Sequence, residues 1–558
     1  MSAPRAAPPF IAPQSHATHQ VENQPAPLDH YNLFTTDRAL GDALAFNLPR
    51  ERRDVARTRL AQFGAELGTP AMFARAAAAN RNTPVLQTHD RQGRRLDEID
   101  YHPAYHELMA VLARQGLHTG AWADGGAGAH VERAAGYLLY AEVENGSQCP
   151  ATMTYGSVPA IRRDARLASE WLPKLYARDY DPRSLPLGGK RAALVGMGMT
   201  EKQGGSDVRA NTTAAAPAGA GAWRITGHKW FLSAPMCDAW LVLAQAPGGL
   251  SCFFMPRFRP DGSRNAIEFL RLKDKLGNRS NASSEVEFHG AHATLLGEEG
   301  RGVPMILEMG VYTRLDCAIG SAGLMRQALA QALWHCAQRS AFGRRLTQQP
   351  VMKNVLADLA LESEAATALA LRLSRAYDAQ ADERELRLAR VLTPASKFWI
   401  CKRGAQFAEE AMEAIGGNGY VEENALARIY REMPVNSIWE GSGNIMCLDV
   451  LRALRKAPDV LAAVAAELDA AAGDAAYARF CAALKDRLAD AAAAESGARA
   501  LTQDLALALQ ASLLARHAPG FVFEAFCASR LAQGLGGAFG TLAAAAPVDQ
   551  LIERAMPR

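Results

Sequence analysis

The stretch Gly196-Met-Gly-Met-Thr-Glu-Lys-Gln-Gly-Gly-Ser-Asp207 carries the strongest local signal in the chain. Its glycines let the backbone approach a ligand closely, because they carry no side chain. Thr200 and Ser206 add hydroxyl groups, and the N–H groups of such a loop are further donors. Downstream, Trp230 stands in a strand-like segment, where its ring could lie against a flat ligand ring or pack in a core. By itself the stretch predicts either a loop that binds an anion or ring, or a simple turn.

The region around this loop, from residue 194 to 302, has the pattern of β-strands. Short segments rich in β-branched and aromatic residues, such as 223–226, 239–243 and 252–255, are separated by turn clusters. No helical stretch long enough for a parallel crossover lies between them. We therefore expect an antiparallel β domain.

Helical periodicity prevails on both sides of this β domain. Leu315, Ile319 and Ala322 recur at spacings of four and three, which places them on one face of a long helix. The pattern predicts helical domains over 41–193 and 303–455. The expected fold is mostly α with a central antiparallel β domain, in the order helical, β, helical, followed by a C-terminal helical appendage.

The two ends of the chain differ in composition from the rest. Residues 1–40 begin with a proline-rich segment that has few packing residues, and we expect a flexible tail there. Residues 457–558 hold 34 alanines among 102 residues, which favours helix. We therefore expect a separate helical extension over 456–558. From residue 457 onward it has 8 Lys and Arg against 11 Asp and Glu, a net charge of 8 − 11 = −3.

The overall composition excludes several classes of protein. The chain has 558 residues, 49% of them hydrophobic, and 61 basic against 58 acidic residues. A mostly disordered chain is excluded, and near-neutrality argues against a chain dominated by nucleic-acid or membrane contacts. No apolar run is long enough to span a membrane. Nine cysteines without a C-x-x-C pair favour a reducing cytoplasm, so a cytoplasmic protein without a membrane partner is expected.

The common nucleotide and metal motifs are missing. No G-x-G-x-x-G fingerprint follows a strand, and Gly189-Lys190 is followed by arginine rather than the Ser or Thr of a P-loop. His102 and His106 could share a helix face, but no third ligand is suggested. We expect a capping or packing role for the histidines and no metal site.

Taken together, the loop and the Trp230 segment resemble the acyl-CoA dehydrogenase family. In that family an M-T-E-x-x-x-G-S-D loop and a W-[IF]-[TS] strand hold the flavin of FAD. Four further elements follow in the family's order: Arg339-Ser-Ala-Phe342-Gly343, Glu413-Ala-Ile-Gly-Gly-Asn-Gly-Tyr420, the basic stretch from Arg428 to Arg431, and Ile438-Trp-Glu-Gly-Ser-Gly-Asn-Ile445. The resemblance covers residues 80–455 and implies FAD as the cofactor.

The resemblance also implies a mechanism. Glu440 stands where family members that carry their catalytic glutamate on this loop have it, and it would remove the α-proton of an acyl-CoA. The flavin would accept the β-hydride at N5. Trp439 replaces the tyrosine that dehydrogenases mostly carry, and its larger ring would narrow the acyl pocket. A restricted cavity would fit poor turnover. For a working dehydrogenase the expected substrate is a short or branched acyl thioester.

The family's cofactor contacts map onto matching positions of this sequence. Thr200 and Ser206 would bond the flavin and its ribityl or phosphate groups, and Trp230 would cover one flavin face. Leu232 replaces the family's frequent threonine, so Ser233 or a backbone N–H must serve flavin N5. The expected cofactor-binding residues are Met197, Met199, Thr200, Gly205, Ser206, Trp230, Phe231, Ser233, Arg339, Phe342, Gly416, Gly417, Trp439, Gly441, Ser442 and Asn444.

Family membership would also imply partners. Arg339 and Phe342 resemble residues that reach the FAD of a neighbouring subunit, through a guanidinium and a phenyl ring. A site completed across subunits requires an oligomer, which by resemblance is a homotetramer. An electron-transfer flavoprotein is the candidate electron acceptor, and an oxidase that uses O₂ is a third, less favoured variant.

A subgroup of the family offers an alternative function. The phrases Met199–Asp207 and Arg431–Met446, and the C-terminal extension, resemble the AidB subgroup of alkylation-response flavoproteins. That resemblance implies binding of double-stranded DNA through the C-terminal domain, with weak or vestigial dehydrogenase activity. Phosphate binding needs a basic face. The candidate DNA-binding residues are Arg452, Arg455, Lys456, Arg516 and Arg530, although the net charge of the extension weighs against the role.

Overall fold

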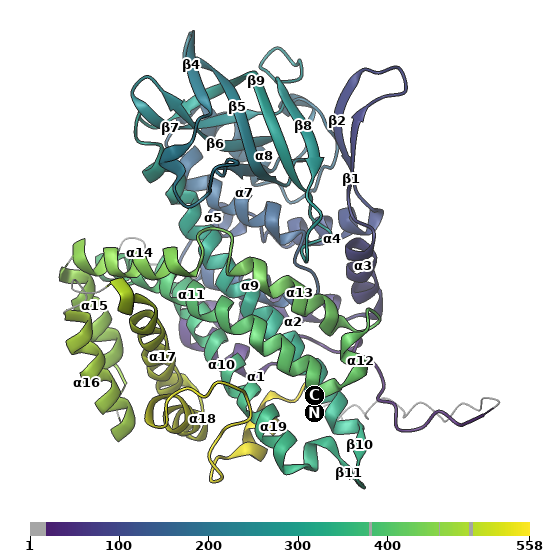
Figure 1. The fold of residues 1–558 in the computed structure, drawn as a ribbon, viewed down its shortest axis with the longest axis vertical. Coiled ribbons are helices and arrows are strands. Elements are labelled where there is room, and N and C mark those ends of the chain that lie inside the picture. Colours follow the sequence, from purple (N-terminus) through teal and green to yellow (C-terminus); the bar gives the residue numbers. More distant parts are fainter. Residues whose placement is uncertain (1–17, 379–381, 457, 472, 490–494) are drawn as a thin grey trace.

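The computed structural model describes residues 18–378, 382–456, 458–471, 473–489 and 495–558. The chain passes through a helical region, a β region that projects at one end, a set of long helices and a further group of C-terminal helices (Figure 1). The predicted mostly-α class with a central, mostly antiparallel sheet is confirmed.

The N-terminal region consists of short helices and one hairpin. Its elements are α1 (Arg38–Asn47), α2 (Arg50–Leu67), α3 (Pro70–Arg81), β1 (Val85–His89), β2 (Arg95–Asp100), α4 (Pro103–Arg114), α5 (Gly120–Asp124), α6 (Ala129–Ala141), α7 (Gln148–Ile161), α8 (Ala165–Leu175) and the 3₁₀ turn η1 (Leu187–Gly189). His102 caps α4, because its Nδ1 accepts the Ala104 N–H at 3.2 Å. Its neighbour His106 contacts the Tyr180 hydroxyl at 3.1 Å.

The β1–β2 hairpin corrects the expectation that residues 41–193 are entirely helical. Asp90 Oδ1 accepts the N–H groups of Gln92 and Arg94, which closes a tight turn between the strands. Gly93 completes the turn at φ +79°, a left-handed conformation that favours glycine.

Part of the expected flexible tail is packed. Leu33 is 1% exposed and Phe34 is also buried. The Tyr31 hydroxyl donates to Gln327 at 2.6 Å, and the Trp334 indole donates to the Ala26 carbonyl at 2.8 Å. The prediction of a tail over residues 1–40 is therefore wrong for 26–40, and residues 1–17 lie outside the described part.

The β region is a seven-stranded sheet in the order β3-β6-β4-β5-β9-β7, with β8 paired to β9. Its elements are β3 (Val195–Gly198), the 3₁₀ turn η2 (Val208–Ala210), β4 (Ala214–Gly219), β5 (Ala222–Ser233), β6 (Ala239–Ala246), β7 (Gly249–Pro256), β8 (Ile267–Leu272) and β9 (Ser283–Leu296). Since β7 also pairs with β6, the sheet closes on itself. Two pairings, β3–β6 and β4–β6, are parallel, so the expectation of a purely antiparallel domain needs that correction. Between β3 and β6 the chain contains only η2, β4 and β5 as regular elements. No α-helix therefore connects the parallel strands.

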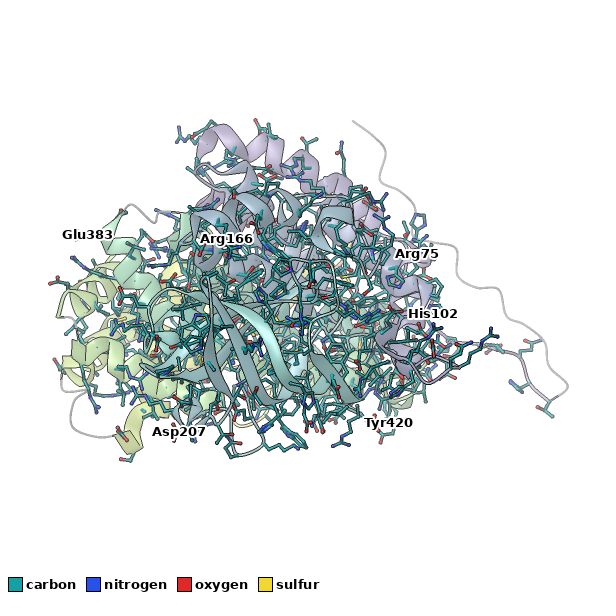
Figure 2. The ribbon with its side chains drawn as sticks, turned by 90° about the horizontal axis from the view of Figure 1, so that it is seen from above. Arg75, His102, Arg166, Asp207, Glu383 and Tyr420 are labelled. Atoms are coloured by element: carbon teal, nitrogen blue, oxygen red, sulfur yellow. The ribbon has the colours of Figure 1, made fainter. Side chains whose placement is uncertain are left out.

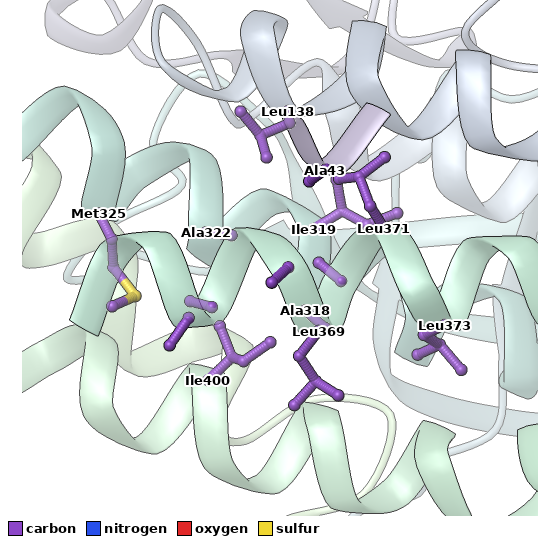
Figure 3. Close-up of a cluster of buried hydrophobic side chains, with 14 of the residues drawn as sticks. Ala43, Leu138, Ala318, Ile319, Ala322, Met325, Leu369, Leu371, Leu373 and Ile400 are labelled. Carbon is purple, nitrogen blue, oxygen red and sulfur yellow. The ribbon is translucent and has the colours of Figure 1, made fainter. Parts of the chain in front are cut away.

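Three long helices build the main core: α9 (Gly302–Gln338), α10 (Pro350–Asp378) and α11 (Glu383–Ile415). Ile319, Leu371 and Ile400, one from each, are buried in a single cluster (Figure 3). The shorter elements are β10 (Ser340–Ala341), β11 (Arg344–Arg345), η3 (Leu346–Gln348), α12 (Gly417–Tyr420), α13 (Ala425–Asn436) and α14 (Gly443–Lys456).

The C-terminal extension shares this core. Its elements are α15 (Pro458–Asp469), α16 (Ala475–Ala489), η4 (Glu495–Gly497), α17 (Ala498–His517), α18 (Gly520–Phe526), the π-helical turn η5 (Cys527–Ala532) and α19 (Val548–Ala555). Leu505 and Leu509 of α17 belong to the same buried cluster as Ile400. The extension is therefore not the separate unit that its composition suggested. Across the described ranges, the model has no helix that is long and apolar enough to cross a membrane.

Candidate active site

The two segments that carried the sequence resemblance lie side by side. The Trp230 N–H donates to the Thr200 carbonyl at 2.8 Å, and the Lys202 N–H donates to His228 Nε2 at 3.1 Å. A Cβ at Gly205 would lie 2.7 Å from the Thr200 hydroxyl oxygen, so only glycine lets the loop fold over Thr200 this closely. Met197 is buried and Met199 and Thr200 are half-buried, whereas Gly205, Ser206 and Asp207 are exposed; Figure 2 shows Asp207 at the surface.

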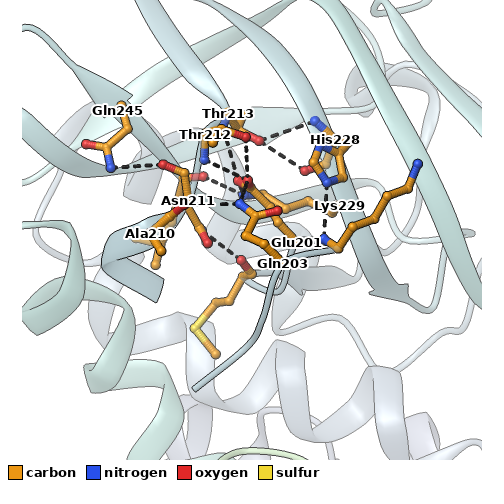
Figure 4. A network of polar contacts seen from close by, with 12 residues as sticks. Glu201, Gln203, Ala210, Asn211, Thr212, Thr213, His228, Lys229 and Gln245 are labelled. Carbon is orange, nitrogen blue, oxygen red and sulfur yellow. Dashed lines mark hydrogen bonds and ion pairs between the residues drawn. The ribbon is translucent and has the colours of Figure 1, made fainter. Parts of the chain in front are cut away.

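A buried ion pair supports this loop from beneath (Figure 4). Glu201 Oε1 lies 2.7 Å from Lys229 Nζ, and both side chains are fully buried. The Glu201 carboxylate also accepts the N–H groups of Thr212 and Thr213. Burial acts to raise the pKa of this carboxyl, but the Lys229 ammonium and the Thr212 and Thr213 donors outweigh burial and lower it to about 2. This pair is not evident from the sequence: Glu201 lies in the quoted glycine-rich loop and Lys229 directly precedes Trp230, but nothing in their spacing signals a contact.

Trp230 presents a half-buried ring to a basic environment. Lys273 Nζ lies 3.2 Å from the centroid of the indole ring, and the Arg271 guanidinium lies 5.8 Å away. Ser233 Oγ contacts Ser283 Oγ at 3.1 Å, while Phe231 is partly exposed. A cation on a tryptophan face stabilises the ring's position by electrostatic attraction.

Glu440 lies in the loop between α13 and α14, and three side chains from the long helices hold this loop. Thr313 Oγ1 donates to Glu440 Oε2 at 2.7 Å, and Arg314 Nε donates to the Glu440 carbonyl at 2.9 Å. Lys397 Nζ donates to the Gly441 carbonyl at 2.8 Å. Burial raises the pKa of the Glu440 carboxyl, and the Thr313 hydroxyl and the charges of Arg314 and Lys397 oppose this.

Two successive residues of this loop have positive φ angles, a conformation that is strained for Glu440 and accessible to Gly441. Glu440 has φ +59° and Gly441 has φ +104°. The φ of Gly441 favours glycine, and a Cβ at this position would also lie 2.7 Å from Met446 Cε, which would have to shift. Strained backbone persists only where surrounding contacts fix it. The bonds from Arg314 and Lys397 to the two carbonyls are such contacts.

The β region meets this loop at Cys149 on α7. The buried Cys149 thiol interacts with Ser233 and lies near enough to Glu440 for the carboxylate charge to affect it; burial is the main cause that raises the pKa of the thiol, to about 12. Trp439 packs against the same apolar cluster as Cys149. Its indole Nε1–H is buried and has no hydrogen-bond partner within the described chain. Cys149, Ser233 and Trp439 thus come together from three regions of the chain on the side of Glu440. The Trp439 indole N–H is the hydrogen-bond donor that has no partner among the described residues.

A second group of predicted site residues lies elsewhere. Phe342 is 99% exposed at φ +51°, and Arg339 donates to the Asn23 carbonyl. Gly416 and Gly417 have open space where a side chain would stand. Figure 1 places the β10–β11 hairpin and α12 together at the end of the helical region farthest from the sheet. Within one chain the structure does not bring this group to Glu440.

Comparison with known proteins tests the resemblance to the acyl-CoA dehydrogenase family. Three family profiles match in order: "Adaptive response protein AidB N-terminal domain" over residues 23–182, "Acyl-CoA dehydrogenase, middle domain" over 196–291 and "Acyl-CoA dehydrogenase, C-terminal domain" over 300–455. Over 441 residues, 79% of this chain and 81% of the relative, the sequence is 54% identical to the Escherichia coli K12 protein named "Putative acyl-CoA dehydrogenase AidB".

The chain belongs to the acyl-CoA dehydrogenase family.

Two further comparisons extend this result to the whole chain. Acyl-CoA dehydrogenase family member 11 of Caenorhabditis elegans is 28% identical over 471 residues, 80% of this chain and 75% of that protein. A crystal structure of Caenorhabditis elegans ACDH-11 in complex with C11-CoA superposes with a TM-score of 0.84 at 25% identity, covering 98% of this chain and 94% of that chain. The likeness to the ACDH-11 structure therefore extends over the C-terminal extension as well.

FAD is the cofactor of acyl-CoA dehydrogenases, and the residues of this chain fit it. Thr200 and Ser206 lie on an accessible loop, beside a Trp230 ring that is not fully buried. The space above Gly416 and Gly417 is open, as a bound adenosine half requires. The family's acyl-CoA oxidoreductase chemistry likewise fits the half-buried Glu440 carboxyl, whose pKa is raised by burial.

The candidate DNA-binding residues of this acyl-CoA dehydrogenase differ sharply in accessibility. The Arg530 side chain is 3% exposed and pairs with Asp358 and Glu362. Arg516 Nη2 lies 2.6 Å from Glu467 Oε1, and its side chain is largely buried. The prediction of a DNA-binding face is therefore wrong for these two arginines, because carboxylates of the core bind them. Arg452 and Arg455 are exposed and pair with Asp449 and Glu495, and the side chain of Lys456 lies outside the described set.

Proposed function

We propose that the protein oxidises the Cα–Cβ bond of an acyl-CoA thioester, with Glu440 as the base that removes the α-proton. The observation that carries the proposal is the held, half-buried Glu440 carboxyl with a raised pKa. A base is most effective when its pKa approaches the working pH. Arg314 and Lys397 keep the loop in its strained conformation, and the carboxyl therefore needs little rearrangement before reaction.

Each residue has a defined task in this reaction. Thr200, Ser206 and Trp230 would hold FAD, which when bound supplies the acceptor for the β-hydride. Glu440 takes the α-proton on its carboxylate. Thr313 orients that carboxylate by donating to Oε2, which leaves Oε1 for the proton. Trp439 packs against the apolar cluster that contains Cys149, on the side of the β region.

We propose that Trp439 limits the acyl chain and that a short or branched acyl group fits best. Its indole lies beside Glu440 and packs against the apolar cluster of the β region. The ACDH-11 structure was solved with C11-CoA, so a panel of substrates must extend from short chains to that length. Replacement of Trp439 by tyrosine should shift preference toward longer chains, measured as the ratio of reduction rates along the panel.

The first experiment is an anaerobic titration of the purified flavoprotein with saturated acyl-CoAs. The expected result is rapid bleaching of the flavin by at least one of them, and loss of bleaching in Glu440→Gln with unchanged flavin content. Bleaching that survives this substitution would overturn the role of Glu440. If no acyl-CoA of the panel reduces the bound flavin, the proposed dehydrogenase activity is overturned. The AidB-like alternative, with weak or vestigial activity, would then remain.

We propose further that the active protein is a homotetramer in which Arg339, Phe342, Gly416 and Gly417 serve the FAD of a neighbouring subunit. The exposed phenyl ring of Phe342 supports this, because a ring held outward at φ +51° is accessible to a neighbouring subunit. An electron-transfer flavoprotein is the proposed electron acceptor. Phe342→Ala should weaken FAD retention and reduce the molecular mass measured by light scattering.

A DNA-binding role gains little support. Two of its five candidate residues are bound to core carboxylates, and the extension beyond residue 456 has a net charge of −3 by sequence. Among the described candidates, Arg452 and Arg455 are exposed, and each pairs with a carboxylate. Salt-dependent binding of a DNA duplex that is lost in the Arg452→Ala/Arg455→Ala variant would restore this function.

A further inference from the structure

The C-terminal extension reaches the loop that carries Glu440. Arg499, in the first turn of α17, donates from Nη1 to the Asn444 side-chain oxygen at 2.8 Å. Asn444 lies four residues after Glu440, in the first turn of α14. Arg499 thus joins the extension to the helix that begins where the Glu440 loop ends.

Two further contacts make this a packed junction rather than a single bond. The Arg499 guanidinium lies 5.3 Å from the centroid of the Phe398 ring. A Cβ at Gly443 would lie 3.4 Å from that ring and 3.7 Å from Arg499 Nη1, so the loop's last residues contact both side chains. Phe398 directly follows Lys397, which donates to the Gly441 carbonyl. The same turn of α11 therefore supports the loop on one side and Arg499 on the other.

We infer that Arg499 is a positioning residue for Glu440, and that the C-terminal extension is a structural part of the active site. The inference rests on the proposed function of Glu440. Arg499 fixes the Asn444 side chain and the start of α14, and this limits opening of the strained turn at Glu440 and Gly441. A planar guanidinium can hydrogen-bond the Asn444 amide and lie over the Phe398 ring at the same time. A lysine ammonium has no planar group that fixes both contacts in one geometry.

The test compares hydrogen–deuterium exchange of the 438–446 amides in full-length protein, since exchange reports local opening without needing turnover. Loss of one charge-assisted hydrogen bond predicts about fivefold faster exchange in Arg499→Ala. Arg487→Ala is the matched control, because Arg487 is an exposed arginine of the same extension that pairs with Asp504. Asn444→Ala should reproduce the effect, and the double variant should add nothing further.

Equal exchange in the Arg499→Ala and Arg487→Ala variants would overturn the inference, as would additive effects in the double variant. If Arg499→Ala fails to fold, Arg499→Lys and Asn444→Ala supply the same comparison. A second readout is the rate of flavin reduction by the best acyl-CoA, expected to fall in Arg499→Ala and to recover partly in Arg499→Lys. If no acyl-CoA reduces the wild-type flavin, the exchange result still decides the inference while the proposed function fails.

Discussion

Lys397 donates a hydrogen bond from Nζ to the carbonyl of Gly441, the residue that follows Glu440, at 2.8 Å. Lys397 is only 1% exposed, so its charge acts through protein rather than through water. One buried side chain therefore both fixes the backbone of the loop and adds a positive charge beside the proposed base.

Replacing Lys397 by methionine should move the pH dependence of flavin reduction upward. The ammonium favours the carboxylate form of Glu440, so its removal raises the pKa of that carboxyl further. Because only the carboxylate takes the α-proton, the acid limb of the rate profile should shift to higher pH, by about one pH unit. Stopped-flow reduction across pH measures this. Lys402→Met, at an exposed position on the same helix, should leave the profile unchanged; an unshifted profile in Lys397→Met would refute the electrostatic role.

Gly441→Ala should slow flavin reduction more than it lowers the amount of bound flavin. The new Cβ would lie 2.7 Å from Met446 Cε, and the φ of +104° is unfavourable for alanine. Strain of about 1–3 kcal/mol is expected, enough to displace the neighbouring Glu440. Gly188→Ala is the control, since a Cβ at that exposed glycine, outside the proposed site, would meet nothing within 4 Å. A rate equal to that of the control would contradict the requirement for glycine.

Glu201→Gln should destabilise the protein strongly, because it leaves the Lys229 ammonium buried without a charged partner. Breaking one side of such a pair costs about 3–5 kcal/mol. The Glu201 pKa is lowered from 4.5 to about 2, so its stabilisation is present above pH 4.5 and is lost as the pH falls toward 2. Urea unfolding at several pH values measures this, and the gap between the two proteins should narrow in acid. Glu98→Gln, which breaks an exposed pair with Arg264, should cost about 1 kcal/mol or less.

Arg530→Met should lower stability and leave any DNA affinity unchanged. The substitution leaves the carboxylates of Asp358 and Glu362 with less positive charge in a buried environment, at a cost of about 3 kcal/mol or more. Arg479→Met, at an exposed position of the extension, should affect neither quantity. Weaker binding of a labelled duplex by folded Arg530→Met protein of normal stability would show that the buried position is misassigned.

Much of the architecture was predictable from local patterns. Apolar residues at helical spacing, such as Leu315 and Ile319, predicted α9, and β-branched segments predicted the strands of the sheet. The β1–β2 hairpin was missed because it is made by a short turn at Asp90 and Gly93 inside a region where helical spacing prevails.

The candidate site was predictable only where it follows a motif. Glu440, Thr200 and Trp230 lie in recognisable phrases, and their roles as base and cofactor contacts stay predictions; the structure adds a backbone hydrogen bond between Trp230 and Thr200. The contacts of Lys397 and Thr313 with the Glu440 loop could not be predicted. Both residues come from helices distant in sequence, and folding alone brings them to the loop. Arg530 was misassigned because a charge count does not reveal which acidic side chain it faces.

The acidic residues that face inward from α10 have a consequence for how a chain of this length could have arisen. Asp358, Glu362 and Glu364 are buried, and arginines of the last hundred residues, Arg530 and Arg554, bind them. Arg554 also binds Asp42 near the other terminus, at 2.7 Å. Deleting the extension would therefore remove positive charges that face these carboxylates and uncover the part of α10 that packs against α17 and α19. The sequences of α10 and of the extension are thus matched to each other, and loss of the extension in evolution would favour compensating changes in α10.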